Sequence, residues 1–378
     1  MSGLYLQIFP SSLASASRMA KIGVSVQQAR LGFDATHLVG MRSANLPDHE
    51  EIAENVQIVR LGMADVPGDF KRIVRVLVWQ LSVLWAYRRT SIAVVAAHKV
   101  WALPLCRLIA MFKGADLVYN CHELETESHG MTGLRQRLAK IVESYNIRAC
   151  TVVSVVNQPI ADWYAKEYGI SPVVVGNIPV AVRSDETAAD LKARLVVPDD
   201  ALLYVHTGHL IEVRNIPLIV EVFSSSRHHV LFLGNGHPRE PHVMELVAAA
   251  SRAHSNIHWM PAVPHERIVD TIRSADIGLC LIEGHVDLSD RLSSPNKLFE
   301  YLAADLPPLC SDLPIARWEL GELADTWILH EPARDLPTAV EQLTSADVAQ
   351  FQQQWGGLRT WNQEVAALLA AYKSLGAH

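Results

Sequence analysis

The stretch Ser293-Ser294-Pro295-Asn296-Lys297-Leu298-Phe299-Glu300-Tyr301 carries the strongest signal in the sequence. Ser294 followed by Pro295 predicts the start of a helix, because a hydroxyl can cap free backbone N–H groups and proline loses no hydrogen bond at the first helical position. Helix amino-termini bind anions, and Lys297 adds a full charge to the first turn. Glu300 lies about one turn further on the same face, where it can accept hydrogen bonds from ribose hydroxyls. The stretch therefore predicts a diphosphate and ribose site on one helix.

Short apolar runs on both sides of this stretch alternate with segments of helical period. The runs are at 4–9, 33–39, 92–97, 115–119 and 151–155, and again at 202–206, 230–233, 256–259, 277–281, 308–310 and 326–329. Helical segments are expected at 15–31, 103–112 and 134–149, and others begin at Ile216, Pro238, Pro264, Pro295 and Pro314. Apolar strands separated by helices indicate parallel sheets that are covered on both faces, so we expect an α/β fold with two doubly wound, Rossmann-like domains.

The length of 378 residues fits two domains, each with its own core. We expect a first domain at 1–178, a second domain at 179–357, and a last amphipathic helix at 358–378. The polar connector at 176–200 is the expected hinge. In such folds ligands lie beyond the carboxyl ends of the strands, so the cleft between the domains is the expected site, with closure about the connector excluding water.

The charge of the chain is unevenly distributed. The net charge is −7, but residues 1–180 hold 18 Lys and Arg against 14 Asp and Glu, while the remainder holds 15 against 26. A basic half favours an anionic partner, such as a lipid headgroup or a phosphorylated acceptor, although uneven surface charge explains it equally well. No nucleic-acid partner is expected.

The cysteines and the amino-terminus bear on the compartment. The five cysteines lie too far apart in sequence for a zinc or redox pair and are expected to be buried thiols. Residues 1–10 lack the pattern of a signal peptide. A cytoplasmic protein is therefore expected.

The segment 69–90 complicates this expectation. It has basic residues at both ends and two tryptophans in an apolar stretch that is too short to span a bilayer. It is either a helix in the interface of the inner face of the cell membrane, which would make the protein peripheral, or a helix packed on the core with solvated arginines.

Several motifs, in the same order along the chain, resemble glycosyltransferase family four and its bacterial relatives of the GT-B class. The stretch 294–304, followed by Leu306-Pro307, is similar to the donor-site signature of that family. Residues 208–215 are similar to its loop after the first strand of the second domain, and 233–236 to its glycine turn. In the first domain, 17–19 with 31–33 and 119–125 resemble the opening helix and the His-Glu motif of related transferases.

The resemblance implies a transferase that uses a nucleotide sugar, most commonly of uridine, with no metal ion and no other cofactor. It implies that the domain at 1–178 binds the acceptor, that the domain at 179–357 binds the nucleotide sugar, and that the helix at 358–378 packs back on the first domain. It implies that Glu300 binds the ribose, that Arg214 contacts the diphosphate, and that His122 faces the donor sugar and the acceptor. The candidate catalytic residues are His122, Glu123, Arg214 and Lys297. The candidate donor-binding residues are Gly208, His209, Arg214, Gly234, Gly236, Ser294, Asn296, Lys297, Leu298 and Glu300. Arg18, Glu125 and Glu283 are candidate contacts to the donor sugar or the acceptor.

Three positions depart from the family pattern. Leu292 stands where the first glutamate of the family is expected, so the contact to the sugar hydroxyls falls to another residue, such as Glu283, or is absent. His209 replaces an arginine, and Asp305 replaces a glycine at a helix end that requires left-handed backbone. These changes leave the identity of the donor sugar open.

The acceptor is a hydroxyl of a glycan, a lipid-linked sugar or a small molecule. Transfer with retention of configuration is favoured, whereas inversion would need Glu123 or Glu125 as a general base. Two other functions fit the sequence: a nucleotide-sugar epimerase of GT-B shape, and a non-catalytic binding or scaffold protein.

Overall fold

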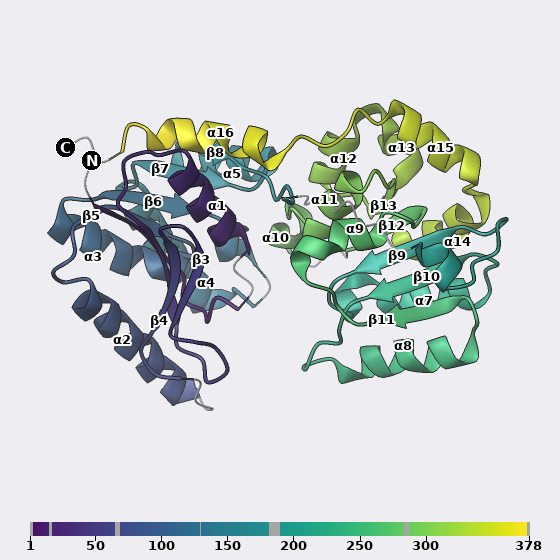
Figure 1. Ribbon diagram of the computed structural model, residues 1–378, viewed down its shortest axis with the longest axis horizontal. Coiled ribbons are helices and arrows are strands. Elements are labelled where there is room, and N and C mark those ends of the chain that lie inside the picture. The colour runs from purple at the N-terminus through teal and green to yellow at the C-terminus, as the bar shows by residue number, and fades with distance from the viewer. Residues whose placement is uncertain are drawn as a thin grey trace. The chain divides into compact units, whose positions relative to one another are not determined.

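The computed structural model describes residues 3–14, 17–64, 69–128, 130–180, 190–282 and 287–375, without the side chains of 69–72. The chain divides into two compact units (Figure 1). Unit 1 comprises Met1–Gly176 and Asn362–His378, and unit 2 comprises Asn177–Trp361. The sequence places the corresponding boundaries after 178 and 357. Each unit is an α/β structure built on its own sheet.

Unit 1 contains an eight-stranded sheet in the order β3-β4-β2-β1-β5-β6-β7-β8. The strands are β1 (Leu4–Ile8), β2 (Thr36–Met41), β3 (His49–Ala53), β4 (Val56–Leu61), β5 (Ile92–Ala97), β6 (Asp116–Asn120), β7 (Val152–Val155) and β8 (Val173–Val174). All neighbours pair in parallel except β3, which runs antiparallel to β4 at the edge. Every residue of β1 is buried, as expected for a central strand covered on both faces.

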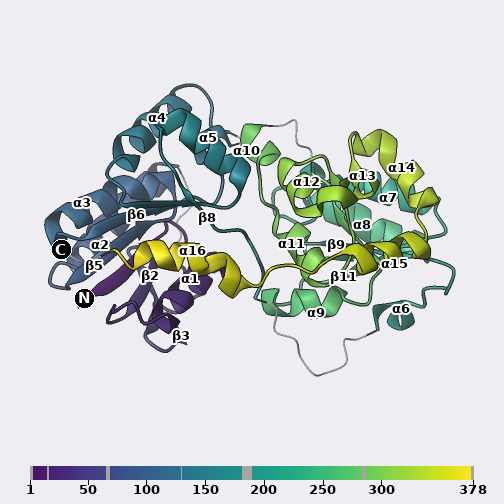
Figure 2. The ribbon, with the colours of Figure 1, turned by 90° about the horizontal axis from the view of Figure 1, so that it is seen from above.

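Helices cover both faces of this sheet. They are α1 (Ser17–Gln28), α2 (Asp69–Ala86), α3 (Leu103–Lys113), α4 (Gly133–Ile147), α5 (Gln158–Tyr168) and α16 (Trp361–Tyr372), with single 3-10 turns at η1 (Val100–Ala102) and η2 (Glu125–Glu127). Crossover connections between parallel strands are right-handed, so the direction in which the chain moves along the sheet decides which face its helix covers. The chain moves one way from β1 to β2, which places α1 on one face, and the other way from β4 through β8, which places α2 to α5 on the opposite face. Figure 2 shows α1 and α16 on one side of the sheet and α3 and α4 on the other.

Helix α16 is fixed to unit 1 by polar contacts at both of its ends. The hydroxyls of Tyr372 and Tyr5 are 3.2 Å apart, and the Glu364 carboxylate accepts a hydrogen bond from the backbone N–H of Gly176. The carboxyl-terminal helix therefore belongs to the fold of unit 1.

Unit 2 contains a six-stranded parallel sheet in the order β11-β10-β9-β12-β13-β14. The strands are β9 (Leu203–Thr207), β10 (His229–Leu233), β11 (Ile257–Met260), β12 (Ile277–Cys280), β13 (Pro308–Ser311) and β14 (Ile328–Leu329). The helices are α6 (Leu191–Arg194), α7 (Ile216–Ser224), α8 (Pro241–Ala253), α9 (Ile268–Ile272), α10 (Leu288–Arg291), α11 (Asn296–Ala303), α12 (Pro314–Leu320), α13 (Ala324–Trp327), α14 (Pro332–Gln342) and α15 (Ser345–Gln354), with 3-10 turns η3 (Glu212–Arg214), η4 (His265–Arg267) and η5 (Gly321–Leu323).

Each sheet has one point where the strand order reverses. In unit 1 this switch point lies between β1 and β5, and in unit 2 between β9 and β12. Loops that leave the carboxyl ends of these strands diverge to opposite faces and leave room for a ligand. The two edges are therefore the places to look for functional side chains.

The expected α/β class and the alternation of strands and helices are confirmed, and two local differences stand out. The hairpin of β3 and β4 was not predicted, because β3 reads His-Glu-Glu-Ile-Ala and buries little. Of the strand expected at 326–329, residues 326–327 belong to α13, which runs to Trp327, and β14 keeps Ile328–Leu329. Asp305 has the expected left-handed backbone, with a φ of 58° directly after α11.

Candidate active site

The start of α11 differs from the prediction in its cap. Pro295 is the N-cap residue and the helix begins at Asn296, so the prediction that Ser294 caps it is wrong. The hydroxyls of Ser293 and Ser294 are instead buried and have no hydrogen-bond partner in the described part of the chain. Asn177 holds the loop by donating from Nδ2 to the carbonyl oxygen of Ser294 at 2.8 Å. Two hydroxyl groups therefore remain at this helix start for a ligand.

Lys297 and Arg214 bring positive charge to the same place. The Lys297 side chain is buried, with Nζ 3.3 Å from Nε2 of His206 at the end of β9. Burial, reinforced by the charge of Arg214, lowers the pKa of Lys297 to about 7. Burial and the same two cations hold the pKa of His206 well below its ordinary value, so this imidazole is neutral. An anion placed here would relieve the repulsion between the cations.

Arg214 is the last residue of η3, in the loop after β9. Asn215, with a φ of 56°, ends this turn and begins α7. Within the described residues the Arg214 guanidinium forms no hydrogen bond and no ion pair. Its five donors are therefore available to a ligand such as a diphosphate.

Glu300 lies one turn along α11 from Lys297 and is also buried. Its Oε2 accepts a hydrogen bond from Oγ1 of Thr207 at 3.0 Å, and Nδ1 of His265 lies 3.6 Å from Oε1. The neighbouring Tyr301 hydroxyl accepts from the Thr207 N–H at 3.0 Å and lies 3.2 Å from the Leu279 carbonyl oxygen. These contacts attach α11 to β9 and β12, the two strands of the switch point.

The two glycine turns of unit 2 pack against each other. Gly208 has a φ of 98°, which favours glycine, and a Cβ on Gly234 would lie 1.8 Å from the Gly208 carbonyl oxygen. A Cβ on Gly236 would lie 2.7 Å from Cβ of Met244. Gly234 is therefore required by the close approach of the loops after β9 and β10, and Gly236 by its packing against α8, whatever ligand binds there. His209 is exposed between them, edge-on to His237.

At the carboxyl edge of unit 1, a chain of polar side chains crosses three strands. The Ser154 hydroxyl donates to Oδ1 of Asn120 at 2.5 Å, which leaves Nδ2 of Asn120 facing Nε2 of His98 at 3.3 Å. His98 therefore carries its proton on Nδ1 and donates it to Nε2 of His122 at 2.9 Å. The His122 ring stacks on Phe9 in the loop after β1.

Both imidazoles of this chain are neutral. Burial lowers the pKa of His98 to about 3, and burial together with His98 and the nearby cations holds the pKa of His122 well below its ordinary value. The hydrogen bond from His98 leaves His122 with its proton on Nδ1. The site can therefore offer a neutral N–H donor rather than a positive charge.

Glu123 and Glu125 share one cation. Nζ of Lys99 lies 2.7 Å from Oε1 of Glu123 and 3.0 Å from Oε1 of Glu125. The second oxygen of Glu125 accepts a hydrogen bond from the Val100 N–H at 2.7 Å, at the start of η1. Burial raises the pKa of Glu125 to about 7, although Lys99 opposes the shift. The geometry makes Glu125 a residue that holds the loop, and only Glu123 is partly accessible.

Arg18 is committed to its own unit. Its guanidinium donates to the carbonyl oxygens of Val175 at 2.8 Å and Gly176 at 3.2 Å. Burial lowers its pKa to about 10, against the attraction of Glu364. Arg18 thus joins α1, the end of the first domain and α16, and this geometry does not fit a sugar contact.

Three candidates remain. Asn296 is exposed at the start of α11. Leu298 lies in the core and its N–H bonds to the Pro295 carbonyl oxygen, so its side chain and its amide are both occupied. Glu283 lies outside the described residues.

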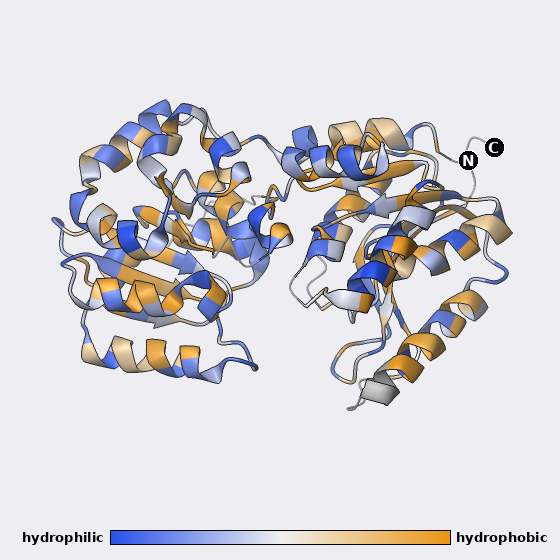
Figure 3. Ribbon diagram, turned by 180° about the vertical axis from the view of Figure 1, so that it is seen from behind, coloured by the Kyte–Doolittle hydropathy of each residue, from blue (hydrophilic) through white to orange (hydrophobic). Residues whose placement is uncertain are grey.

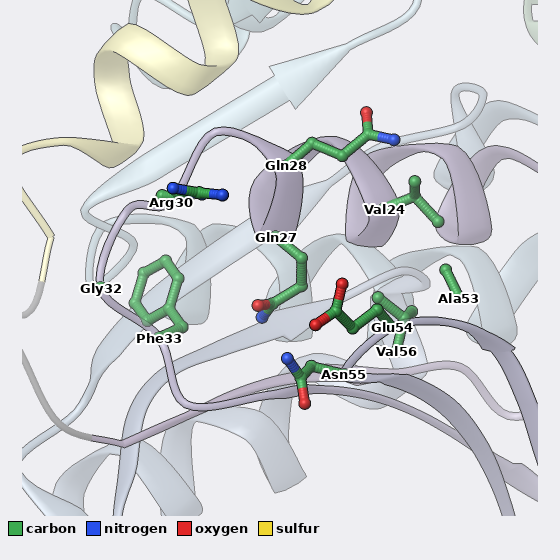
Figure 4. Close-up of a pocket in the computed structure, with 10 residues that line it drawn as sticks. All are labelled: Val24, Gln27, Gln28, Arg30, Gly32, Phe33, Ala53, Glu54, Asn55 and Val56. Atoms are coloured by element: carbon green, nitrogen blue, oxygen red, sulfur yellow. The ribbon is translucent and has the colours of Figure 1, made fainter.

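Sequence reasoning missed His98, His206 and Thr207. Each lies at, or directly after, the carboxyl end of a buried apolar strand, where a polar residue is a signal in itself. The hollow in Figure 4 lies elsewhere in unit 1, at the amino-terminal ends of β2 and β4, between the end of α1 and the β3–β4 turn. It is therefore separate from the edge that carries His122.

Among the described residues, no three side chains of His, Cys, Asp or Glu come together as a metal site requires. No helix in the same residues is long and apolar enough to cross a membrane.

Comparisons with known proteins bear on the fold. Residues 24–186 match the profile of Glycosyltransferase Family 4. A search among curated proteins finds no match. Among solved structures, sucrose-phosphate synthase from Thermosynechococcus elongatus superposes with a TM-score of 0.76 at 13% identity, covering 98% of both chains. HepE of Anabaena in complex with UDP-glucose gives a TM-score of 0.68 at 13% identity, covering 98% of this chain and 100% of its own.

The chain has the GT-B fold and resembles the glycosyltransferases of family 4. The GT-B fold is also found in a putative UDP-N-acetylglucosamine 2-epimerase from Listeria monocytogenes, with a TM-score of 0.60 at 15% identity over 99% of this chain and 96% of that one. At these identities the likeness establishes the fold of the molecule, and the reaction has to be argued from the side chains.

Proposed function

We propose that this GT-B protein transfers a sugar from a UDP-sugar to a hydroxyl group of an acceptor. The observation that carries the proposal is the pair Lys297 and Arg214, two cations held together at the switch point of unit 2. They lie beside a helix start with two unpartnered hydroxyls and one turn from Glu300. A diphosphate suits the cations and the helix start, and a ribose suits the carboxylate.

The choice of uridine follows the similar proteins. HepE of Anabaena is described in complex with UDP-glucose, with UDP, and with UDP and glucose. A change in melting temperature on adding UDP or GDP would decide between the two bases, because only a nucleotide that binds the folded protein raises it.

In the proposed reaction, the bond between the anomeric carbon and the β-phosphate oxygen breaks and the acceptor oxygen bonds to that carbon. The acceptor approaches on the face that the phosphate leaves, so its proton passes to the departing phosphate and the configuration is retained. Lys297 and Arg214 stabilise the charge on the leaving diphosphate and take the part that a metal ion has in other enzymes. Retention is supported by the pairing of Glu123 and Glu125 with Lys99, which leaves neither carboxylate well suited as a general base.

The acceptor is a hydroxyl of a glycan, a lipid-linked sugar or a small molecule, and we place the reaction in the cytoplasm, at the inner face of the cell membrane. We keep His122 as the residue of unit 1 that contacts substrate, because its remaining N–H is a neutral donor. Glu123 remains a candidate catalytic residue, as the general base that inversion would need.

The test measures release of UDP from UDP-glucose with and without acceptor extracts. Release that depends on an acceptor and is lost in Lys297→Ala and Glu300→Ala, but kept in the surface control Lys166→Ala, supports the proposal. Near-normal turnover in both site variants would remove the donor-site assignment.

An epimerase is the second candidate, since the Listeria protein shares the fold. Conversion of the donor sugar without acceptor would favour it. Binding of UDP-glucose with no turnover would favour a scaffold protein.

A further inference from the structure

Helix α4 is turned the opposite way from an ordinary amphipathic helix. Its large apolar side chains recur at helical spacing, at Leu134, Leu138, Ile141 and Tyr145, which predicts a core-facing stripe. All four are exposed, with Leu134 at 83%. The residues buried beneath α4 are instead Ala139, Glu143, Asn146 and Ile147. The apolar stripe of α4 therefore faces away from the core of unit 1.

Helix α3 extends the same feature. Leu105, Cys106 and Ile109 pack inward, yet Met111 is 73% exposed and Phe112 is 79% exposed. Apolar side chains therefore lie on both the inner and the outer side of α3, and an apolar outer side is normally covered by protein or lipid.

Helix α2 repeats the pattern within the segment that the sequence singled out. Trp79 and Val83 are buried, and the Trp79 indole donates to the Gly40 carbonyl oxygen at 2.9 Å. Ile73, Leu77, Leu81 and Trp85, each four residues after the last, are exposed. Figure 3 shows α2 as a largely apolar helix. The alternative that this helix simply packs on the core accounts for one side of it and leaves the other unexplained.

The three outer sides are linked by contacts on the same face of the sheet. Nζ of Lys113, at the end of α3, donates to the Arg88 carbonyl oxygen just after α2, at 2.7 Å. The Arg107 guanidinium of α3 lies 4.2 Å from the centre of the Tyr145 ring of α4. We call the outward sides of α2, α3 and α4 the apolar face.

The charged residues of 73–86, α3 and α4 are cations with one exception, and one of these cations, Lys140, is paired with Glu127 at 2.5 Å. The exception is Glu143, the one acidic residue in 73–86, α3 and α4. It is buried and accepts hydrogen bonds from Tyr119, Tyr164 and Tyr168. Exposed arginines lie on α4, at Arg135 and Arg137, and just beyond α2 and α4, at Arg89 and Arg148. The Arg88 guanidinium lies 3.6 Å above the Trp85 ring, the arrangement of an aromatic side chain at a water boundary.

We propose that the apolar face binds the surface of a bilayer that contains anionic lipids. Apolar side chains enter the interface while arginines contact the headgroups, as in helices that lie in a membrane plane. A second copy of the chain is a poorer partner, because pairing this face with itself would bring the cations together.

Membrane binding stands independently of the transfer reaction. If the proposed function also holds, the acceptor is one that the membrane presents, because the apolar face lies on the unit to which the acceptor is assigned. That second step rests on the proposed function.

The experiment is flotation of the full chain with vesicles of neutral phosphatidylcholine, or of phosphatidylcholine with phosphatidylglycerol. Binding is expected on the anionic vesicles alone and is expected to weaken as salt rises. The apolar variant Phe112→Glu with Leu138→Glu should lose binding, and Arg135→Gln with Arg137→Gln should lower the affinity by ~5-fold or more. Matched controls in unit 2 are Trp318→Glu, which is equally exposed, and Arg252→Gln.

Two results would overturn the proposal. One is an absence of binding to anionic vesicles at low salt, and the other is equal binding by the apolar variant and its control. If sedimentation shows a dimer of the wild-type chain and a monomer of the apolar variant, the apolar face binds a second copy of the chain instead. An unchanged melting curve shows that the variants are folded. An unchanged rise in melting temperature on adding UDP shows that their donor site is intact.

Discussion

The carboxyl edges of the two sheets have the same architecture and opposite chemistry. In unit 1 the switch point carries neutral imidazoles, since burial and the bond from His98 keep His122 uncharged. In unit 2 it carries Lys297 and Arg214, whose charges repel each other. The edge of unit 1, the neutral edge, is satisfied by its own hydrogen bonds, whereas the edge of unit 2, the cationic edge, requires an anion. The difference teaches that a shared fold fixes where a ligand binds and the side chains decide which ligand.

The largest expected effect is on the cationic edge. Lys297→Ala removes a charge that faces the leaving diphosphate, and we expect turnover to fall by roughly 100-fold or more. The rate of UDP release at saturating donor measures it. A fall caused by unfolding would appear as a lower melting temperature, which Lys166→Ala should not show.

The loop packing that supports this edge comes next. In Gly234→Ala the new Cβ would lie 1.8 Å from the Gly208 carbonyl oxygen, so the loops after β9 and β10 must separate. We expect the free energy of unfolding to fall by roughly 2–3 kcal/mol, measured by urea denaturation. Gly356→Ala is the matched control, because nothing lies near its added Cβ. Equal stability of the two variants would contradict the packing account.

The pH dependence of nucleotide binding distinguishes the edges further. The pKa of Lys297 is lowered to about 7 in the free protein, and a bound diphosphate should raise it. Binding then takes up a proton above pH 7, so the affinity for UDP should fall by up to about tenfold per pH unit between pH 7 and 9. Calorimetric titration measures this slope. In Lys297→Arg, whose charge is permanent, the slope should be lost, and an unchanged slope would assign the proton elsewhere.

The smallest effect is expected at the neutral edge. The pKa values of His98 and His122 lie below the ordinary value, so neither imidazole should titrate between pH 6 and 8 in nuclear magnetic resonance spectra. Both groups bind protons more weakly in the folded chain than in the unfolded one. Their contribution to stability is therefore complete above about pH 6.5 and is lost as the pH falls below it. If His122 titrated with a midpoint near neutral pH, the neutral edge would carry a positive charge and would no longer differ from the cationic edge.

The sequence predicts much of the fold because buried parallel strands leave continuous apolar runs, as in β1 and β10. It does not predict β3, whose polar residues pair at an edge and bury little. The sequence predicts the helix α4 but not its orientation, because a stripe from Leu134 to Tyr145 has the same spacing whether it faces a core or a surface.

The candidate site divides in the same way. Lys297 and Glu300 were predicted and lie close together because they share one helix, and Arg214, also predicted, lies near Lys297 because its loop follows β9, the strand to which α11 is attached. Arg18 and Glu125 were also candidates, and their partners in space, the carbonyl oxygens of 175–176 and the Val100 N–H, are far apart from them in sequence. A local pattern cannot reveal such partners.

Calorimetric titration of UDP into the protein and into Arg214→Ala with Lys297→Ala tests the central claim most directly. We predict saturable binding at one site in the wild-type chain and a loss of roughly 100-fold in affinity in the double variant, with the melting temperature of the free protein retained. Equal affinity in the two proteins would show that the cationic edge of unit 2 is not where the nucleotide binds.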